Sequence, residues 1–166
     1  EAFKDIDNLY VADGHHRTAA AENYAIKMRK EVGDYTGQEE FNYYLAMIAP
    51  KNSLYVMDYN RVVEDLNGYD FDTFRNLLTK NFLIDQVDRG YKPKEKYEYG
   101  MYIYGVWYRL KVKDEVIDTI NKTSKNLAID LLDVSLLHDL LIEPILGIDV
   151  PQRDKRIDFI GGIRGL

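Results

Sequence analysis

Apolar residues recur with the period of an α-helix between His16 and Val32. Ala20, Tyr24, Met28 and Val32 are spaced four residues apart, and charged residues lie between them. This spacing places the apolar side chains on one face of a helix, which we predict to end at the Gly-Asp pair that follows. Three further helices are predicted at 70–81, at 114–121 and from 133 onward. Their predicted N-caps are Asp70 or Asp72 and Asp133, and Pro144 and Gly147 would end the last one.

Short runs of apolar and aromatic residues predict strands between these helices. The run Leu9–Ala12 ends at Asp13-Gly14, as is typical of a strand followed by a tight turn. Segments 41–49 and 54–63 are expected to pair as an antiparallel hairpin across the Pro-containing turn at 50–53. Segment 41–49 also fits a buried helix, but its aromatic residues favour a strand. Strands are further predicted at 82–87 and 156–160.

The stretch 97–112 is rich in tyrosine and has apolar residues at both odd and even positions. This pattern indicates a central strand or a hairpin that is covered on both faces. Gly100 and Gly105 interrupt it as candidate bulges or bends. The tyrosines could also form a stacking platform for bases or sugars, but their two-faced distribution favours packing in a core.

The irregular interleaving of strands and helices predicts a mixed α+β fold, with a largely antiparallel sheet and packed helices, in a single domain spanning 1–166. The sequence opens at Glu1 rather than at Met, and its first predicted strand follows after only a few residues. A buried strand so early needs partner strands from elsewhere. We therefore expect this chain to be the C-terminal part of a longer protein.

Composition narrows the function classes. Apolar residues make up 46% of the 166 residues and charged residues 30%, which fits a folded domain with a sizeable core. The net charge of −6 argues against non-specific DNA binding, and we expect no DNA partner. The absence of cysteine excludes disulfides and thiolate chemistry and fits a reducing, cytoplasmic setting. No apolar stretch reaches the roughly 18 residues of a membrane span, and no signal peptide is visible.

The candidate chemistry is concentrated in Asp13-Gly14-His15-His16-Arg17-Thr18, at the predicted start of the first helix. The unpaired amides and positive dipole of a helix N-terminus form a site for anions. Gly14 would let the backbone approach a ligand closely, and Arg17 offers a planar fork of donors suited to phosphate or carboxylate. We predict Gly14 to Thr18 as the phosphate- or nucleotide-binding residues, and Asp13, His15 and His16 as the catalytic candidates.

Simpler interpretations of the same residues stay open. Asp-Gly before a helix is common capping and turn chemistry, and the two histidines could be solvated side chains. A zinc site built on these histidines would need an additional carboxylate or a remote ligand, and we predict no metal site here.

The string Val11-Ala12-Asp13-Gly14-His15-His16-Arg17 resembles the signature A-D-G-H-H-R of an uncharacterised prokaryotic family, a domain of unknown function. Tyr59–Val63 resembles that family's tyrosine-histidine-arginine-valine strand, although Asn60 replaces the histidine. Segments 133–138 and 143–148 are similar to its C-terminal helix and the exit from it. The resemblance touches nearly the whole chain and implies that members extend further on the N-terminal side.

The turn is more distantly similar to that of the ParB/sulfiredoxin-like superfamily, which includes sulfiredoxins, CTP-binding partition proteins and free serine kinases. The resemblance implies that Gly14, His15, His16 and Arg17 grip nucleotide phosphates. Sulfiredoxins have a catalytic cysteine at the position of His15, so sulfinic-acid reduction is excluded in a chain without cysteine. In the kinase members, the catalytic carboxylate lies upstream of the turn.

Three further residues have chemistry-bearing side chains. Asp58 and Arg61 could lie at a cleft, although surface polar contacts are the simpler interpretation. His138, beside Asp139, lies off the apolar stripe of the last helix, where a structural or solvated role is more common than catalysis.

The leading hypothesis is a phosphate- or nucleotide-binding protein, with a small-molecule kinase or phosphotransferase as its activity and a nucleotide with Mg²⁺ as its cofactor. The alternative is a non-catalytic regulatory or interaction module that senses a ligand in the same anion pocket. A DNA-binding partition-type factor is a third option, which conflicts with the acidic charge. The sequence predicts neither an oligomeric state nor a membrane partner.

Overall fold

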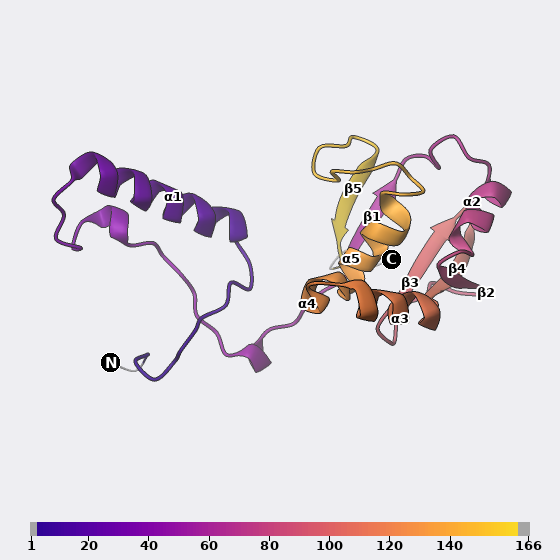
Figure 1. Ribbon diagram of the computed structural model, residues 1–166, viewed down its shortest axis with the longest axis horizontal. Helices are drawn as coiled ribbons and strands as arrows, with labels where there is room; N and C mark the ends of the chain where they lie inside the picture. Colours follow the sequence, from indigo (N-terminus) through magenta and orange to yellow (C-terminus); the bar gives the residue numbers. More distant parts are fainter. Residues whose placement is uncertain (1–2, 163–166) are drawn as a thin grey trace. The chain divides into compact units, whose positions relative to one another are not determined.

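The computed structural model of the 166-residue chain describes residues 3–162 (Figure 1). The chain divides into two compact units, Glu1–Tyr55 and Val56–Leu166, which are described separately. The described residues form five α-helices and two small antiparallel sheets, which confirms the α+β class. The single domain over 1–166 stays a prediction. Among the described residues, no helix has the length and apolar character needed to cross a membrane.

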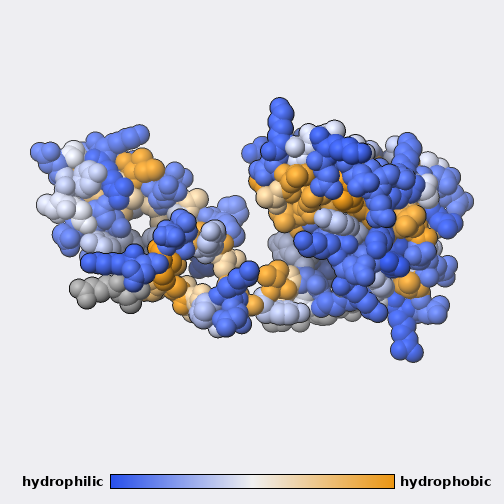
Figure 2. Space-filling view, turned by 60° about the horizontal axis from the view of Figure 1, so that its bottom comes forward, coloured by the Kyte–Doolittle hydropathy of each residue, from blue (hydrophilic) through white to orange (hydrophobic). Residues whose placement is uncertain are grey.

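The Glu1–Tyr55 unit is built around helix α1, His15–Val32, which confirms the predicted helix to within one residue. Two short 3-10 turns follow, η1 at Glu40–Asn42 and η2 at Lys51–Ser53. The Arg29 Nε donates to Asn42 Oδ1 at 2.8 Å and ties η1 to the helix. Large apolar side chains are nevertheless exposed in this unit, among them Tyr10, Leu45 and Met47, and Figure 2 shows apolar residues at its surface.

Two strand predictions in this unit are wrong. Residues 9–12 have no strand partner among the described residues and form an irregular segment. Segment 41–49 begins in η1 and continues without pairing, so the predicted hairpin does not form. Residues 59–63, which the hairpin would have used, pair with β5 (Ile157–Gly161) instead. Just before η1, the Glu39 carboxylate accepts hydrogen bonds from Thr36 N at 2.7 Å and Gly37 N at 2.9 Å, which fixes a turn. These backbone hydrogen bonds lower the pKa of Glu39 to about 2.

The larger sheet of the Val56–Leu166 unit contains β2 (Phe82–Val87), β3 (Glu98–Ile103) and β4 (Val106–Val112), in the order β2-β4-β3. All neighbours are antiparallel, and Leu110 in the central strand β4 lies opposite Ile84 on one side and Tyr99 on the other. The hairpin interpretation of 97–112 is therefore confirmed. Its two-residue turn, Tyr104-Gly105, has positive φ angles of 49° and 83°, as type I′ hairpin turns require.

The smaller sheet pairs β1, Tyr59–Val63, with β5, Ile157–Gly161. Figure 1 shows the two strands side by side, although they are almost a hundred residues apart in sequence. Only the second half of the predicted strand 54–63 forms. It pairs with the C-terminal strand rather than with 41–49.

The helices of this unit are α2 (Phe71–Leu78), α3 (Asp114–Thr123), α4 (Leu127–Asp130) and α5 (Asp133–Leu137), and α5 continues into a π-helical turn, η3, at His138–Ile142. The predicted N-cap Asp133 is displaced by one position, because Leu132 occupies the cap. The Asp133 carboxylate instead accepts a hydrogen bond from Tyr97 N at 2.7 Å and joins α5 to the start of β3. As predicted, the helical segment ends before Pro144, since η3 ends at Ile142, and Gly147 lies in the exit with a φ of 68°.

The core lies between the two sheets and the helices. Its fully buried side chains come from α2, β2, β4, α5 and the segment after η3, and they are Leu78, Phe82, Leu110, Val112, Leu136 and Ile148. Tyr97, Tyr99 and Tyr108 pack in or against this core, as expected for the tyrosine-rich stretch. Tyr102 and Tyr104 are exposed, so the outer end of that hairpin is not covered.

Asp70 provides the first test of this fold. It is the N-cap of α2, as predicted, and its Oδ1 accepts a hydrogen bond from Thr73 N at 2.8 Å. We expect Asp70→Ala to lower the free energy of unfolding by about 1 kcal/mol, because one amide of the first turn loses its acceptor. Urea unfolding followed by the fluorescence of Trp107 measures this. Asp72→Ala, in the same first turn but outside the cap position, is the matched control, and an equal loss in both variants would contradict the assignment.

Candidate functional site

The Asp13–Thr18 turn forms the N-terminus of α1, as the sequence predicted. Gly14 occupies the N-cap in the left-handed conformation, with φ 75° and ψ 29°, where a side chain would be strained. Its carbonyl accepts from Thr18 N at 2.9 Å, which closes the first helical turn. No side chain caps the helix and no acidic residue lies in its first turn. Among the described residues, the amides of His15, His16 and Arg17 therefore keep their hydrogen-bonding capacity for a ligand.

Arg17 folds back over the glycine of this turn. A Cβ built on Gly14 would lie 3.3 Å from Arg17 Nη2 and 3.4 Å from Nε, so the guanidinium lies against the Gly14 backbone. The arrangement places a positive fork beside the free amides. Both contribute to the same positive potential at the end of the helix.

The other predicted site residues of the turn make fewer contacts than Gly14 and Arg17. Asp13, His15 and His16 are exposed, and Thr18 is half-buried. Within the described part of the chain, Asp13 makes no hydrogen bond or ion pair with either histidine, so no acid–base pair is assembled. The structure thus brings Gly14 and Arg17 together and leaves Asp13, His15 and His16 as independent exposed groups.

The third histidine lies in a different cluster. His138, Asp139 and Glu143 have donor atoms within 4.8 Å of one another, and His138 Nε2 lies 3.6 Å from Glu143 Oε2. The two carboxylates are exposed and the histidine is half-buried. Exposed acidic groups lie this close in many proteins without holding a metal, so we assign the cluster no function.

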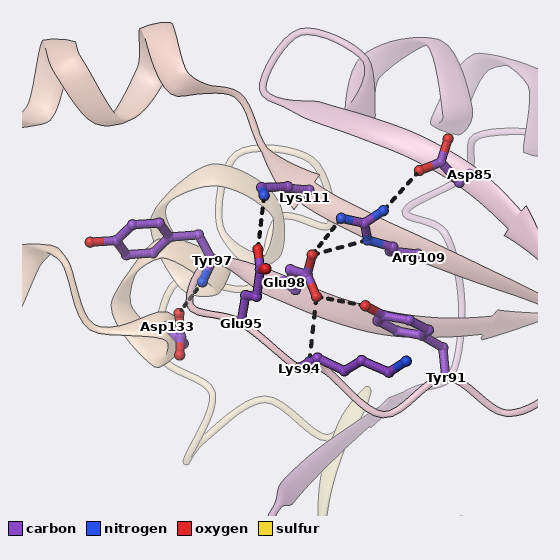
Figure 3. A network of polar contacts seen from close by, with 9 residues as sticks. All are labelled: Asp85, Tyr91, Lys94, Glu95, Tyr97, Glu98, Arg109, Lys111 and Asp133. Carbon is purple, nitrogen blue, oxygen red and sulfur yellow. Dashed lines mark hydrogen bonds and ion pairs between the residues drawn. The ribbon is translucent and has the colours of Figure 1, made fainter.

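The most buried polar group among the described residues is Glu98, at the start of β3 (Figure 3). Its side chain is 2% exposed, and both carboxylate oxygens are fully used. Oε1 accepts from Arg109, whose Nε lies 3.0 Å away, and Oε2 accepts from the Tyr91 hydroxyl at 2.6 Å and from Lys94 N at 3.4 Å. These bonds outweigh the effect of burial and lower the pKa of Glu98 to about 2.

The Glu98 network fastens a loop to the sheet rather than forming a site. Tyr91 and Lys94 belong to the loop between β2 and β3, whereas Arg109 projects from β4 on the face away from the core. The loop also crosses directly over Gly100, where a Cβ would collide with the Tyr91 carbonyl oxygen. The pairing of β3 with β4 is continuous through Gly100, so the predicted bulge is absent. The glycine instead allows the loop to approach the strand closely.

Comparison with known proteins adds one finding. A family model described as "Protein of unknown function (DUF1015)" matches residues 1–135. The chain belongs to the DUF1015 family. The matched range contains the Asp13–Thr18 turn and the Tyr59–Val63 strand, and it ends within α5. No curated protein and no solved structure matches the chain. Membership in DUF1015 confirms the predicted domain of unknown function and leaves its ligand open.

Proposed function

We propose that the Asp13–Thr18 turn of this DUF1015 protein binds a phosphate group, and specifically the phosphates of a nucleotide. The observation that carries the proposal is the uncapped helix N-terminus with Arg17 folded onto Gly14. An 18-residue helix with free amides and no acidic residue in its first turn attracts an anion to this end. Arg17 adds charge-assisted donors in the planar geometry that phosphate oxygens accept.

The activity proposed for this site is that of a small-molecule kinase or phosphotransferase. Arg17 and the amides of the first turn would hold the phosphate oxygens, with Thr18 beside them. His15 or His16 would stabilise the negative charge that develops in phosphoryl transfer. Asp13 is exposed at the same turn and would either orient a histidine or ligate Mg²⁺, which shields phosphate charge when bound. The distant resemblance to ParB/sulfiredoxin-like proteins supports the same choice of ligand.

The second candidate is a non-catalytic module that senses a ligand at the same turn. It is favoured by the exposure of Asp13, His15 and His16, which lack described partners to orient them. Catalytic acids and bases are normally held in place by hydrogen bonds. Turnover of a phosphoryl donor separates the two, because the sensing module would bind nucleotide without consuming it.

The variant Arg17→Ala tests the proposed ligand. We expect it to weaken phosphate binding by about 1.5–3 kcal/mol, roughly ten- to a hundredfold, since a charge-assisted contact is removed. The fold should survive, because the Arg17 side chain is exposed. Calorimetry with ATP, ADP, CTP and inorganic phosphate, with and without Mg²⁺, measures the affinities.

Lys30→Ala is the matched control for charge. Lys30 lies in the last turn of the same helix and is exposed, so its loss changes the net charge equally but at the opposite end. Equal affinity in the wild type and Arg17→Ala, or no binding of any of the four ligands, would refute the proposal.

A further inference from the structure

The Val56–Leu166 unit contains a cavity of about 480 Å³ between the β1–β5 sheet and the helical segment from α4 to η3. Its apolar lining includes Ile142 and Ile157, which are buried, and Phe159, which is half-buried. Arg61, Ser135 and Gln152 contribute polar groups. Apolar and polar residues contribute to the lining in equal number, and a cavity of this volume has the dimensions of a small-molecule site.

Arg61 contacts a backbone carbonyl and two aromatic rings at the wall of this cavity. Its Nη1 donates to the Tyr59 carbonyl oxygen at 2.7 Å. Its guanidinium carbon lies 5.7 Å from the ring centre of Phe159 and 6.0 Å from that of Tyr59, and the two rings stack on each other at 5.3 Å. The cation is therefore oriented by two aromatic rings and a backbone carbonyl, and its other N–H donors have no hydrogen-bond partner among residues 3–162.

Arg61 also lacks a counter-charge. Within the described residues, no carboxylate lies within ion-pair distance of it, whereas Arg109 and Arg156 each pair with two. Arg61 is half-buried, and this burial lowers the pKa of its guanidinium. Removing a guanidinium from water without pairing it with an anion costs free energy, and an anionic ligand bound to Arg61 would offset that cost.

The remaining charges around the cavity restrict the type of anion. Asp130, Asp139 and Asp149 also line it. Asp130 accepts from the Ser124 hydroxyl at 2.7 Å, and Asp139 and Asp149 are exposed to solvent. His138 is oriented toward Glu143. The three carboxylates oppose any anion, and they repel a dianion such as a phosphate monoester about twice as strongly as a monoanion. A monoanion in direct contact with Arg61 is therefore the favoured form of ligand.

We propose that this cavity binds a small apolar monocarboxylate, with its carboxylate on the Arg61 guanidinium and its apolar body against Ile142, Ile157 and Phe159. The site lies in a different unit from the Asp13–Thr18 turn and takes a different ligand, so the inference goes beyond the proposed function. Guanidinium pairs with carboxylate through two parallel hydrogen bonds, and the apolar lining removes the rest of the ligand from water.

The experiment measures the affinity of the full chain for phenylpropionate and hexanoate, for the amides of both acids, and for phenyl phosphate, by calorimetry. We expect the carboxylates to bind at least about tenfold more tightly than the amides and than phenyl phosphate. Arg61→Gln should lower carboxylate affinity by about tenfold or more and leave amide affinity unchanged. Arg89→Gln is the control, because Arg89 is exposed and lies outside the cavity.

A second variant covers the case in which Arg61→Gln does not fold. Val134 lines the cavity and is half-exposed, so Val134→Trp should occupy part of the cavity without disturbing the core, and it should abolish binding of carboxylates and amides alike. Circular dichroism establishes that each variant is folded. Equal affinity for carboxylate and amide in the wild type, tighter binding of phenyl phosphate, or unchanged binding in Val134→Trp would each overturn the proposal. Arg17→Ala should leave carboxylate binding intact, which separates this result from that of the proposed function.

Discussion

Replacing Glu98 by Gln is expected to lower the free energy of unfolding of the Val56–Leu166 unit by about 3 kcal/mol. The amide cannot accept the bonds from Tyr91 and Lys94 N while also neutralising Arg109, so a buried charge pair is broken and not replaced. The loss falls at the lower end of the range for buried pairs, because Arg109 is one-third exposed and keeps Asp85 at 3.6 Å.

The effect of Glu98→Gln should depend on pH in a defined direction. The folded-state pKa of Glu98 is lowered from 4.5 to about 2, so the ionised carboxylate stabilises the fold fully above pH 4.5. This stabilisation is lost as the pH falls from 4.5 towards 2, because the folded protein must then take up a proton that the unfolded chain already carries. The difference between wild type and Glu98→Gln should therefore be largest near neutral pH and shrink in acid.

Urea unfolding at several pH values measures both effects, and Trp107 is a suitable probe. It is the only tryptophan in the chain and lies on β4 within the unit concerned. Glu95→Gln is the matched control, because Glu95 pairs with Lys111 at 3.2 Å but is well exposed, and its loss should cost less than about 1 kcal/mol. A difference between wild type and Glu98→Gln that stays constant from pH 7 to about pH 2.5 would contradict the assigned pKa.

Gly100→Ala is expected to destabilise the same unit by about 2–3 kcal/mol. The added methyl group would collide with the carbonyl oxygen of Tyr91, which belongs to the backbone and cannot rotate away, and it would lie 3.6 Å from the Trp107 ring. The loop must then lift from the sheet, and the hydrogen bond from Tyr91 to Glu98 is strained with it.

The control for this variant is Gly161→Ala, in strand β5. Gly161 also has ordinary strand geometry, but a Cβ there would meet no atom of the described residues within 4 Å, so the free energy of unfolding should change by less than about 0.5 kcal/mol. Unfolding midpoints in urea compare the two. If both variants lower the free energy of unfolding by the same small amount, the loop does not pack closely on Gly100.

Elements that carry their own local signal could be predicted from sequence. Helix α1 follows from its four-residue spacing, and α2 from its apolar spacing and the Asp70 cap. The β3–β4 hairpin follows from alternation with a glycine at the turn. The partner of β1 could not be predicted, because β5 lies far away in sequence and pairing over that distance leaves no local trace. Segment 41–49 has the composition of a strand but no partner among the described residues, which shows that β-propensity depends on what is available to pair.

The same distinction between local and distant residues applies to the candidate sites. The Asp13–Thr18 turn was visible because residues adjacent in sequence form it, and the structure adds only the position of Arg17 over Gly14. The Glu98 network and the Arg61 cavity were missed as assemblies, since their members come from separate strands and loops. One signal was present for the first. A glutamate within an otherwise aromatic and apolar strand calls for a partner, and Arg109 lies on the facing strand.

Strand β4 is hydrogen-bonded on both edges and covered on both faces. Its even-numbered side chains, such as Leu110, belong to the hydrophobic core, and its odd-numbered Arg109 belongs to the Glu98 network. Lifting the loop from one face therefore uncovers the strand that supports the other, so the two layers cannot melt independently. We therefore expect the hydrophobic core and the Glu98 network to unfold as one cooperative unit, so that a substitution in either lowers the stability of both.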